Sequence, residues 1–210
     1  PLRLAVLGRL LAARLQRLTL HVGHGLGGGA TRYVDQIRGL ARAPDHEIGH
    51  LVPSRGRLSL TLDTARAALT LGPDELFGLL ERLEEAGVAV DLHLDARLGY
   101  DSVFLDRLLS GRWPYAVTLH DFQWYCPKVH LVDGRDFYCE EPPADVCRHC
   151  TVRGVTHDYA DQNALMGGGL GGWLATNERI LRGARRLVAP SHDTAARYAR
   201  RLGLTGIAVV

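Results

Sequence analysis

The sequence predicts an α/β fold: a Rossmann-like parallel sheet with helices on both faces. Short apolar runs of strand length alternate along the chain with longer stretches whose apolar residues recur at helical spacing. The first short run, residues 18–23, leads through a glycine-rich turn into a helical stretch, as in many nucleotide-binding α/β domains. A later run, residues 115–119, ends in the polar pair His120 and Asp121. Alternation of this kind is typical of a doubly wound parallel sheet.

The composition is that of an ordinary globular protein. The chain has 210 residues, of which 46% are hydrophobic and 23% charged, enough for one large domain or two small ones. A formal net charge of +2 gives no strong electrostatic case for binding nucleic acid. No apolar run reaches the ~18 residues that a membrane span needs. Nothing in the chain points to export, so we expect a cytoplasmic location.

The two ends of the chain predict an N-terminal helix and a domain that continues beyond this sequence. Leucines recur at helical spacing between residues 2 and 15, which predicts a packing helix within residues 1–17. Residues 18–210 are then expected to form the Rossmann-like domain. The chain starts with Pro1 and stops inside an apolar run at Val210, so we expect a piece of a longer protein.

The remaining elements are predicted from caps and periodicity. Pro73 and two acidic residues open a strong helix that Gly87 ends, and Asp101 and Ser191 are expected to cap later helices. The stretch 154–172, which contains the glycine run 167–172, has no such pattern and predicts a flexible or lid-like loop, with plain disorder as the alternative. Further helices are expected at residues 30–41 and 173–184, and further strands at 46–52, 57–63 (at a sheet edge), 88–94, 186–190 and 207–210.

The glycines that follow the first strand are a candidate phosphate site. Gly27, Gly28 and Gly29 stand directly before the first helix of the α/β unit. Glycine lets the backbone approach a phosphate closely, and a helix N-terminus favours an anion. The spacing does not match the dinucleotide pattern G-x-G-x-x-G, so a plain tight turn is the alternative.

All four cysteines lie close together in one loop. They are Cys126, Cys139, Cys147 and Cys150, and the last two form the C-x-x-C knuckle of structural zinc sites. The loop has few apolar residues to build its own core, so a metal ion would explain how it holds its shape. The alternatives are two disulfides, a redox pair or an iron–sulfur cluster. His130 and His149 are candidate substitute ligands.

His120 and Asp121 are candidate catalytic residues because they follow a buried strand directly. A histidine there can donate a hydrogen bond to a sugar hydroxyl or a phosphate, or accept one. The carboxylate of Asp121 can fix that ring, accept a proton or cap the turn. A solvated turn is the alternative, and it is disfavoured because the glycine turn and Ser191 are expected at the same sheet edge.

Four segments together resemble the N-terminal half of a family-4 glycosyltransferase of the GT-B type. They are Gly27 to Gly29, residues 117–122 (VTLHDF), residues 126–128 (CPK) and residues 188–191 (VAPS). The resemblance covers roughly residues 18–210 at the level of motif order. It departs from the family pattern at Asp95, where the matching strand often carries a second histidine two positions after the equivalent of His93.

The resemblance implies an enzyme that moves a sugar from a nucleotide-sugar donor to a hydroxyl of a sugar or lipid-linked acceptor. It implies retention at the anomeric carbon, no catalytic metal, and a C-terminal donor domain that this chain does not include. It implies that Gly27, Gly28, Gly29 and Ser191 lie by the donor, with His120 near the transferred sugar and Asp121 orienting it. It is compatible with peripheral association of the full-length enzyme with a membrane.

Two other functions compete with this interpretation. The first is a binding module without catalysis, in which zinc stabilises an α/β domain that recognises a polymer or a protein. The second is an epimerase or another dinucleotide enzyme, which needs an acidic residue at the end of the second strand. Residues 50–53, HLVP, offer none, so this alternative ranks last.

Overall fold

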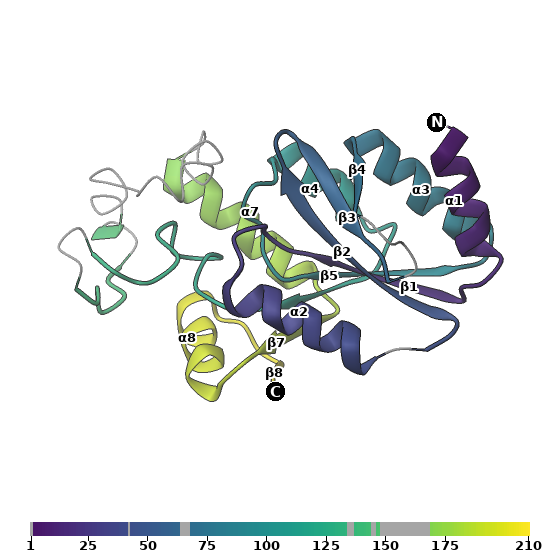
Figure 1. Ribbon diagram of the computed structural model, residues 1–210. Coiled ribbons are helices and arrows are strands. Elements are labelled where there is room, and N and C mark those ends of the chain that lie inside the picture. The colour runs from purple at the N-terminus through teal and green to yellow at the C-terminus, as the bar shows by residue number, and fades with distance from the viewer. Residues whose placement is uncertain (1, 42, 64–67, 134–136, 144–145, 148–168) are drawn as a thin grey trace. The chain divides into compact units, whose positions relative to one another are not determined.

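The computed structural model describes residues 2–41, 43–63, 68–133, 137–143, 146–147 and 169–210 (Figure 1). It confirms an α/β fold, in which a mostly parallel sheet of eight strands is flanked by helices. The order across the sheet is β4-β3-β2-β1-β5-β6-β7-β8. The strands are β1 (Arg17–Val22), β2 (His46–Ser54), β3 (Arg57–Thr61), β4 (Leu69–Leu71), β5 (Ala89–Leu94), β6 (Tyr115–Thr118), β7 (Arg186–Ala189) and β8 (Ile207–Val209).

The helices lie close to where the periodicity predicts them. Two begin earlier than predicted, because glycines that we expected in loops belong to them: Gly28 opens α2 and Gly169 opens α7. The flexible or lid-like loop predicted at 154–172 is therefore wrong for residues 169–172, while 154–168 lie outside the described residues. The helices are α1 (Leu2–Ala12), α2 (Gly28–Leu40), α3 (Pro73–Glu85), α4 (Ser102–Leu108), α7 (Gly169–Gly183) and α8 (His192–Leu202).

The prediction of an entirely parallel sheet is wrong at one edge. β2 pairs with β3, and β3 with β4, in antiparallel fashion. Only Arg55 and Gly56 connect β2 to β3, both at positive φ (49° and 75°), as in a tight hairpin turn. A parallel pairing would need a crossover of a dozen or more residues, so this connection dictates an antiparallel pair. The edge strand is β4, which the sequence did not predict, and not β3.

The strand order contains a topological switch point beside β1. β1 pairs in parallel with β2 on one side and with β5 on the other. The chain thus leaves β1 in one direction, through α2 to β2, and later returns to its opposite side through α3. In open α/β sheets, ligands bind beyond the carboxyl ends of the strands at such a point. The carboxyl ends of β1 and β5 are therefore where we look for a site.

The chain divides into two compact units, Pro1–Ala116 and Val117–Val210. In the first unit, the apolar side chains of β1 at Leu18, Leu20 and Val22 are buried. Figure 1 shows α2 on one side of these strands and α1 with α3 on the other. In the second unit, Trp124 and Tyr198 are fully buried, and the buried amide of Asn177 donates to the Trp124 carbonyl at 3.0 Å.

Candidate functional site

Three histidines form a row across neighbouring strands of the first unit. His21 of β1 is in register with His50 of β2 on one side and with His93 of β5 on the other. Side chains at directly paired positions point to the same face of a sheet. The sheet thus gathers three imidazoles at the switch point, near the carboxyl ends of β1 and β5 and in the middle of β2.

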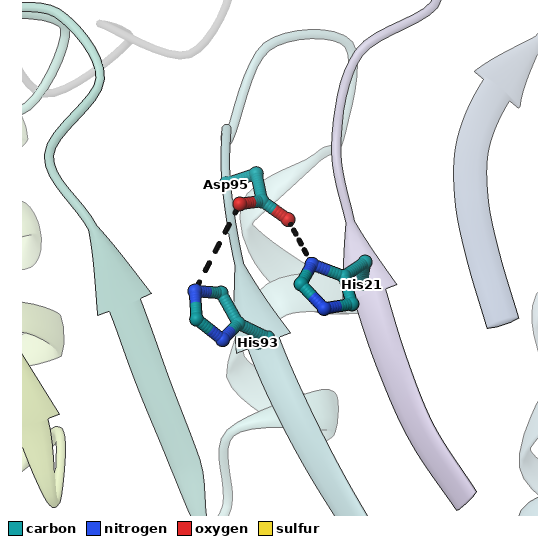
Figure 2. A group of neighbouring side chains, drawn as sticks. All are labelled: His21, His93 and Asp95. Atoms are coloured by element: carbon teal, nitrogen blue, oxygen red, sulfur yellow. Dashed lines mark hydrogen bonds and ion pairs between the residues drawn. The ribbon is translucent and has the colours of Figure 1, made fainter. Parts of the chain in front are cut away.

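Asp95 links two of these histidines. It follows β5 directly, and its backbone N–H donates to the Val22 carbonyl at 2.8 Å, which fixes it beside the end of β1. Its Oδ2 lies 2.7 Å from Nδ1 of His21, and its Oδ1 lies 3.8 Å from Nε2 of His93 (Figure 2). The side chains of Asp95 and His21 are 0% and 2% exposed, whereas that of His93 is 16% exposed. His93 is therefore the member of this group that solvent reaches.

Helix α2 packs over the same group. The rings of His21 and His93 are stacked, with centroids 4.6 Å apart and planes 14° from parallel. Tyr33 of α2 approaches both rings, with centroid distances of 6.3 Å. Aromatic contacts on this scale favour one arrangement of the rings. The imidazoles are therefore held between the sheet and a helix.

His50 completes the row under a tight steric constraint. A Cβ atom at position 23 would lie 2.9 Å from Nε2 of His50, so any larger residue there would force the His50 ring to shift. Burial lowers the pKa of His50; nearby Asp95 acts to raise it, and His21 and Arg38 act to lower it. The neutral imidazole, a hydrogen-bond acceptor and potential metal ligand, is thus favoured at position 50.

Two imidazoles and a carboxylate can transfer protons or hold a metal ion. The ligand atoms of His21, His93 and Asp95 all lie within 4.8 Å of one another, and no other such group of histidine, cysteine or acidic side chains exists among the described residues. The sequence drew attention to His93 and Asp95 but gave no role to His21 or His50. The signal available was a histidine inside each of two predicted strands, His21 in the first and His50 in the second.

The predicted donor glycines lie where β1 joins α2. Gly27 is the N-cap of α2 and Gly28 its first residue, with φ of 77° and 84°. A Cβ atom at Gly27, Gly28 or Gly29 would meet nothing within 4 Å. The helix N-terminus is thus uncrowded, as an approaching phosphate requires.

The predicted catalytic pair and Ser191 lie in the second unit. His120 is half-buried just after β6, and the carboxylate of Asp121 accepts a hydrogen bond from the Gln123 N–H at 2.8 Å. The Ser191 hydroxyl accepts from the Thr194 N–H at 3.1 Å, which confirms the predicted helix cap. The carboxylate of Asp121 thus caps its own turn, which is one of the three roles expected for it. The same contact fixes the orientation of the Asp121 side chain.

Three of the four cysteines line one cavity in the second unit. Cys126, Cys139 and Cys147 contribute to its wall, while Cys150 lies outside the described residues. The volume of this cavity is about 460 Å³. Arg201 reaches the same wall: it donates to the Pro142 carbonyl at 2.7 Å and to the Cys147 sulfur at 3.4 Å. A neighbouring guanidinium favours the thiolate form of a cysteine.

Glu141 ties this loop to helix α8. Its side chain is 6% exposed and accepts hydrogen bonds from the hydroxyls of Tyr125 at 2.9 Å and Tyr138 at 3.0 Å. Arg197 of α8 pairs with the same carboxylate. Burial acts to raise the pKa of Glu141, but these hydrogen bonds outweigh it and hold the pKa below its usual value of 4.5. Burial also raises the pKa of Tyr125, so its hydroxyl stays a donor.

We expect Glu141→Gln to destabilise the second unit by about 2 kcal/mol at neutral pH, because charge-assisted hydrogen bonds contribute more than neutral ones. The carboxylate stabilises the fold above pH 4.5, and this contribution is lost as the pH falls through the lower folded-state pKa. The cost of the substitution should therefore shrink in acid. Urea unfolding of the unmodified protein and of Glu141→Gln, at pH 7 and at pH 3.5, measures this cost in the free energy of unfolding. An equal cost at both pH values would contradict the charge-based explanation.

Comparison of the chain with protein-family models, with curated proteins and with solved structures found no match. The resemblance stated from the sequence motifs therefore stays a prediction. In the parts of the chain that the structure describes, no helix is both long and apolar enough to cross a membrane.

Proposed function

We propose that this chain is the acceptor-side domain of a GT-B glycosyltransferase, which transfers a sugar from a nucleotide-sugar donor to an acceptor hydroxyl. One observation carries the proposal: β1 runs through a glycine turn into α2 at the topological switch point of the sheet. This is where open α/β folds bind ligands, and the uncrowded N-terminus of α2 suits an anion. The motif order that resembles the family supports the same function.

The other predicted residues have definite roles in this proposal. His120 contacts the transferred sugar, and Asp121, whose carboxylate is held by the Gln123 N–H, orients His120. Ser191 is the N-cap of α8 and fixes the first turn of that helix, which contacts the donor in this proposal. Backbone N–H groups stabilise the charge that develops on the leaving diphosphate. The donor itself is held mainly by a second domain.

Gly29→Val tests the proposal in the full-length protein. Position 29 lies in the first turn of α2 and has no positive φ, so valine fits the backbone but projects into the space proposed for the phosphate. We expect the affinity for a panel of nucleotide sugars, measured by calorimetry, to fall roughly tenfold, which corresponds to about 1.4 kcal/mol. Gly28 is a poorer choice because its φ of 84° strains any side chain.

Gly39→Val is the matched control. Gly39 lies near the opposite end of the same helix, and a Cβ atom there also meets nothing within 4 Å. Both variants introduce the same β-branched residue into α2, so they share any effect on helix stability. Equal loss of affinity in the two variants, or no loss in Gly29→Val, would refute phosphate binding at this turn.

A zinc-stabilised binding module is the second candidate function. Its supporting observation is that Cys126, Cys139 and Cys147 line one cavity, where their three sulfur atoms would have to move closer together to share an ion. In this candidate the loop, held to α8 by Glu141 and Arg201, forms a recognition surface and the chain catalyses nothing. The two candidates differ in nucleotide-sugar binding, which the module lacks. The zinc ion itself is common to both.

A further inference from the structure

We propose that His21, His93 and Asp95 form a second metal site, one that binds a single divalent transition-metal ion such as Zn²⁺ or Co²⁺ between the ends of β1 and β5. This site is separate from the cysteine loop and goes beyond the proposed transferase, which needs no catalytic metal.

The chemistry of the three side chains fits such an ion. Two imidazoles and one carboxylate are a common ligand set for zinc and for other divalent metals of the first transition row. One nitrogen from each histidine and one oxygen from Asp95 lie within 4.8 Å of one another. Ligand atoms about 2.1 Å from a common tetrahedral ion lie about 3.4 Å apart, so the group must contract by up to about 1.4 Å when the ion binds.

Burial gives the site its driving force. Asp95 is 0% exposed, and a buried carboxylate is costly unless positive charge or hydrogen bonds compensate it. In the structure, His21 faces one carboxylate oxygen and His93 the other. A cation between them would replace the single proton shared by Asp95 and His21 and would neutralise the carboxylate more completely. His21, His93 and Asp95 thus offer a metal ion three ligands that already lie close together and are largely shielded from water.

The orientation of the two rings decides how the ion enters. A metal ion lies in the plane of the imidazole that binds it, and the rings of His21 and His93 are only 14° from parallel. One ring must therefore turn on binding. His21 is fixed by burial, being 2% exposed, so His93, which is 16% exposed, is the ring that turns. Three protein ligands leave a coordination position open on the solvent side.

Cobalt titration of this chain tests the site, since Co²⁺ bound by thiolates gives an intense near-ultraviolet band that imidazole and carboxylate ligands do not give. The background carries serine in place of all four cysteines, at positions 126, 139, 147 and 150, which removes every thiolate from the chain. We expect one Co²⁺ bound with visible bands and no thiolate band. His93→Ala should weaken this binding by more than roughly 100-fold, since loss of an outer-shell partner alone typically costs 10–100-fold.

Two further variants make the result decisive. Asp95→Asn should also abolish cobalt binding, whereas His46→Ala should not, because His46 lies at the other end of β2 and contacts Thr19. If circular dichroism shows that Asp95→Asn does not fold, His93→Ala tests the proposal instead, because His93 is partly exposed and its replacement disturbs the core less. Absence of the visible bands, or equal weakening by His46→Ala and His93→Ala, would overturn the proposal. Neither result bears on nucleotide-sugar binding, which the Gly29→Val experiment tests separately.

Discussion

Protein purified without added metal is expected to hold about one thiol-bound zinc ion per chain, and Cys147→Ser is expected to lose it. Cys147 supplies half of the C-x-x-C knuckle, and its sulfur lies on the cavity wall shared with Cys126 and Cys139. A mercurial that reacts with thiols should release this zinc, while zinc bound by histidines stays in place. Elemental analysis before and after this treatment gives the number of thiol-bound zinc ions per chain. Loss of the ion should loosen the loop and spare the first unit.

Glu141→Gln is the control for this experiment. It weakens the attachment of the same loop to α8 but keeps all four thiols, so its zinc content should stay normal. Two disulfides in metal-free protein, or four thiols that titrate freely without zinc, would show that the cysteines serve another purpose. Iron with inorganic sulfide would favour the cluster alternative instead.

Replacing His120 by alanine is expected to lower kcat roughly 100-fold in the full-length protein, with a smaller change in donor affinity. The reason is that the proposed contact is with the sugar being transferred, where charge develops during the reaction. Side chains that contact only the reacting centre affect turnover more than ground-state binding. Steady-state kinetics and calorimetry on the same preparation separate the two effects.

His46→Ala is the comparison for His120→Ala, because this histidine contacts Thr19 of the neighbouring strand and has no proposed part in transfer. Its kcat should equal that of the unmodified protein. An unchanged kcat in His120→Ala would identify His120 as an ordinary turn residue. If His120→Ala lowered donor affinity by the same factor as kcat, His120 would contact the bound donor in the ground state and would not act specifically at the reacting carbon.

Local interactions in this protein were predictable from the sequence because their partners are neighbours in the chain. The acids after Pro73 indicate the start of α3, and Glu75 indeed accepts a hydrogen bond from the Gly72 N–H at 2.7 Å. Asp101 caps α4 through the Phe104 N–H at 2.7 Å, and Ser191 caps α8 in the same way. Each contact spans three residues, so residue type and spacing suffice to predict it.

The antiparallel edge of the sheet is a feature that local sequence patterns did not predict. Arg55 and Gly56 form a two-residue connection that is typical of a hairpin. The alternation of strands and helices in the rest of the sequence nevertheless favoured a parallel sheet. β4 has only three residues, Leu69–Leu71, too few for periodicity to identify. Its pairing with β3 gives it its structure, and that pairing is a tertiary contact.

The sequence by itself determined the α/β class, the helix caps and the candidate chemistry of the glycine turn and the cysteine loop. Only the tertiary structure brought His21, His50, His93 and Asp95 together. Alternation within a strand shows which side chains share a face, but it does not show which strands are neighbours. That choice depends on which surfaces can be buried against one another across the whole first unit. A histidine in each of three separate strands therefore becomes a site only when β1 pairs with both β2 and β5.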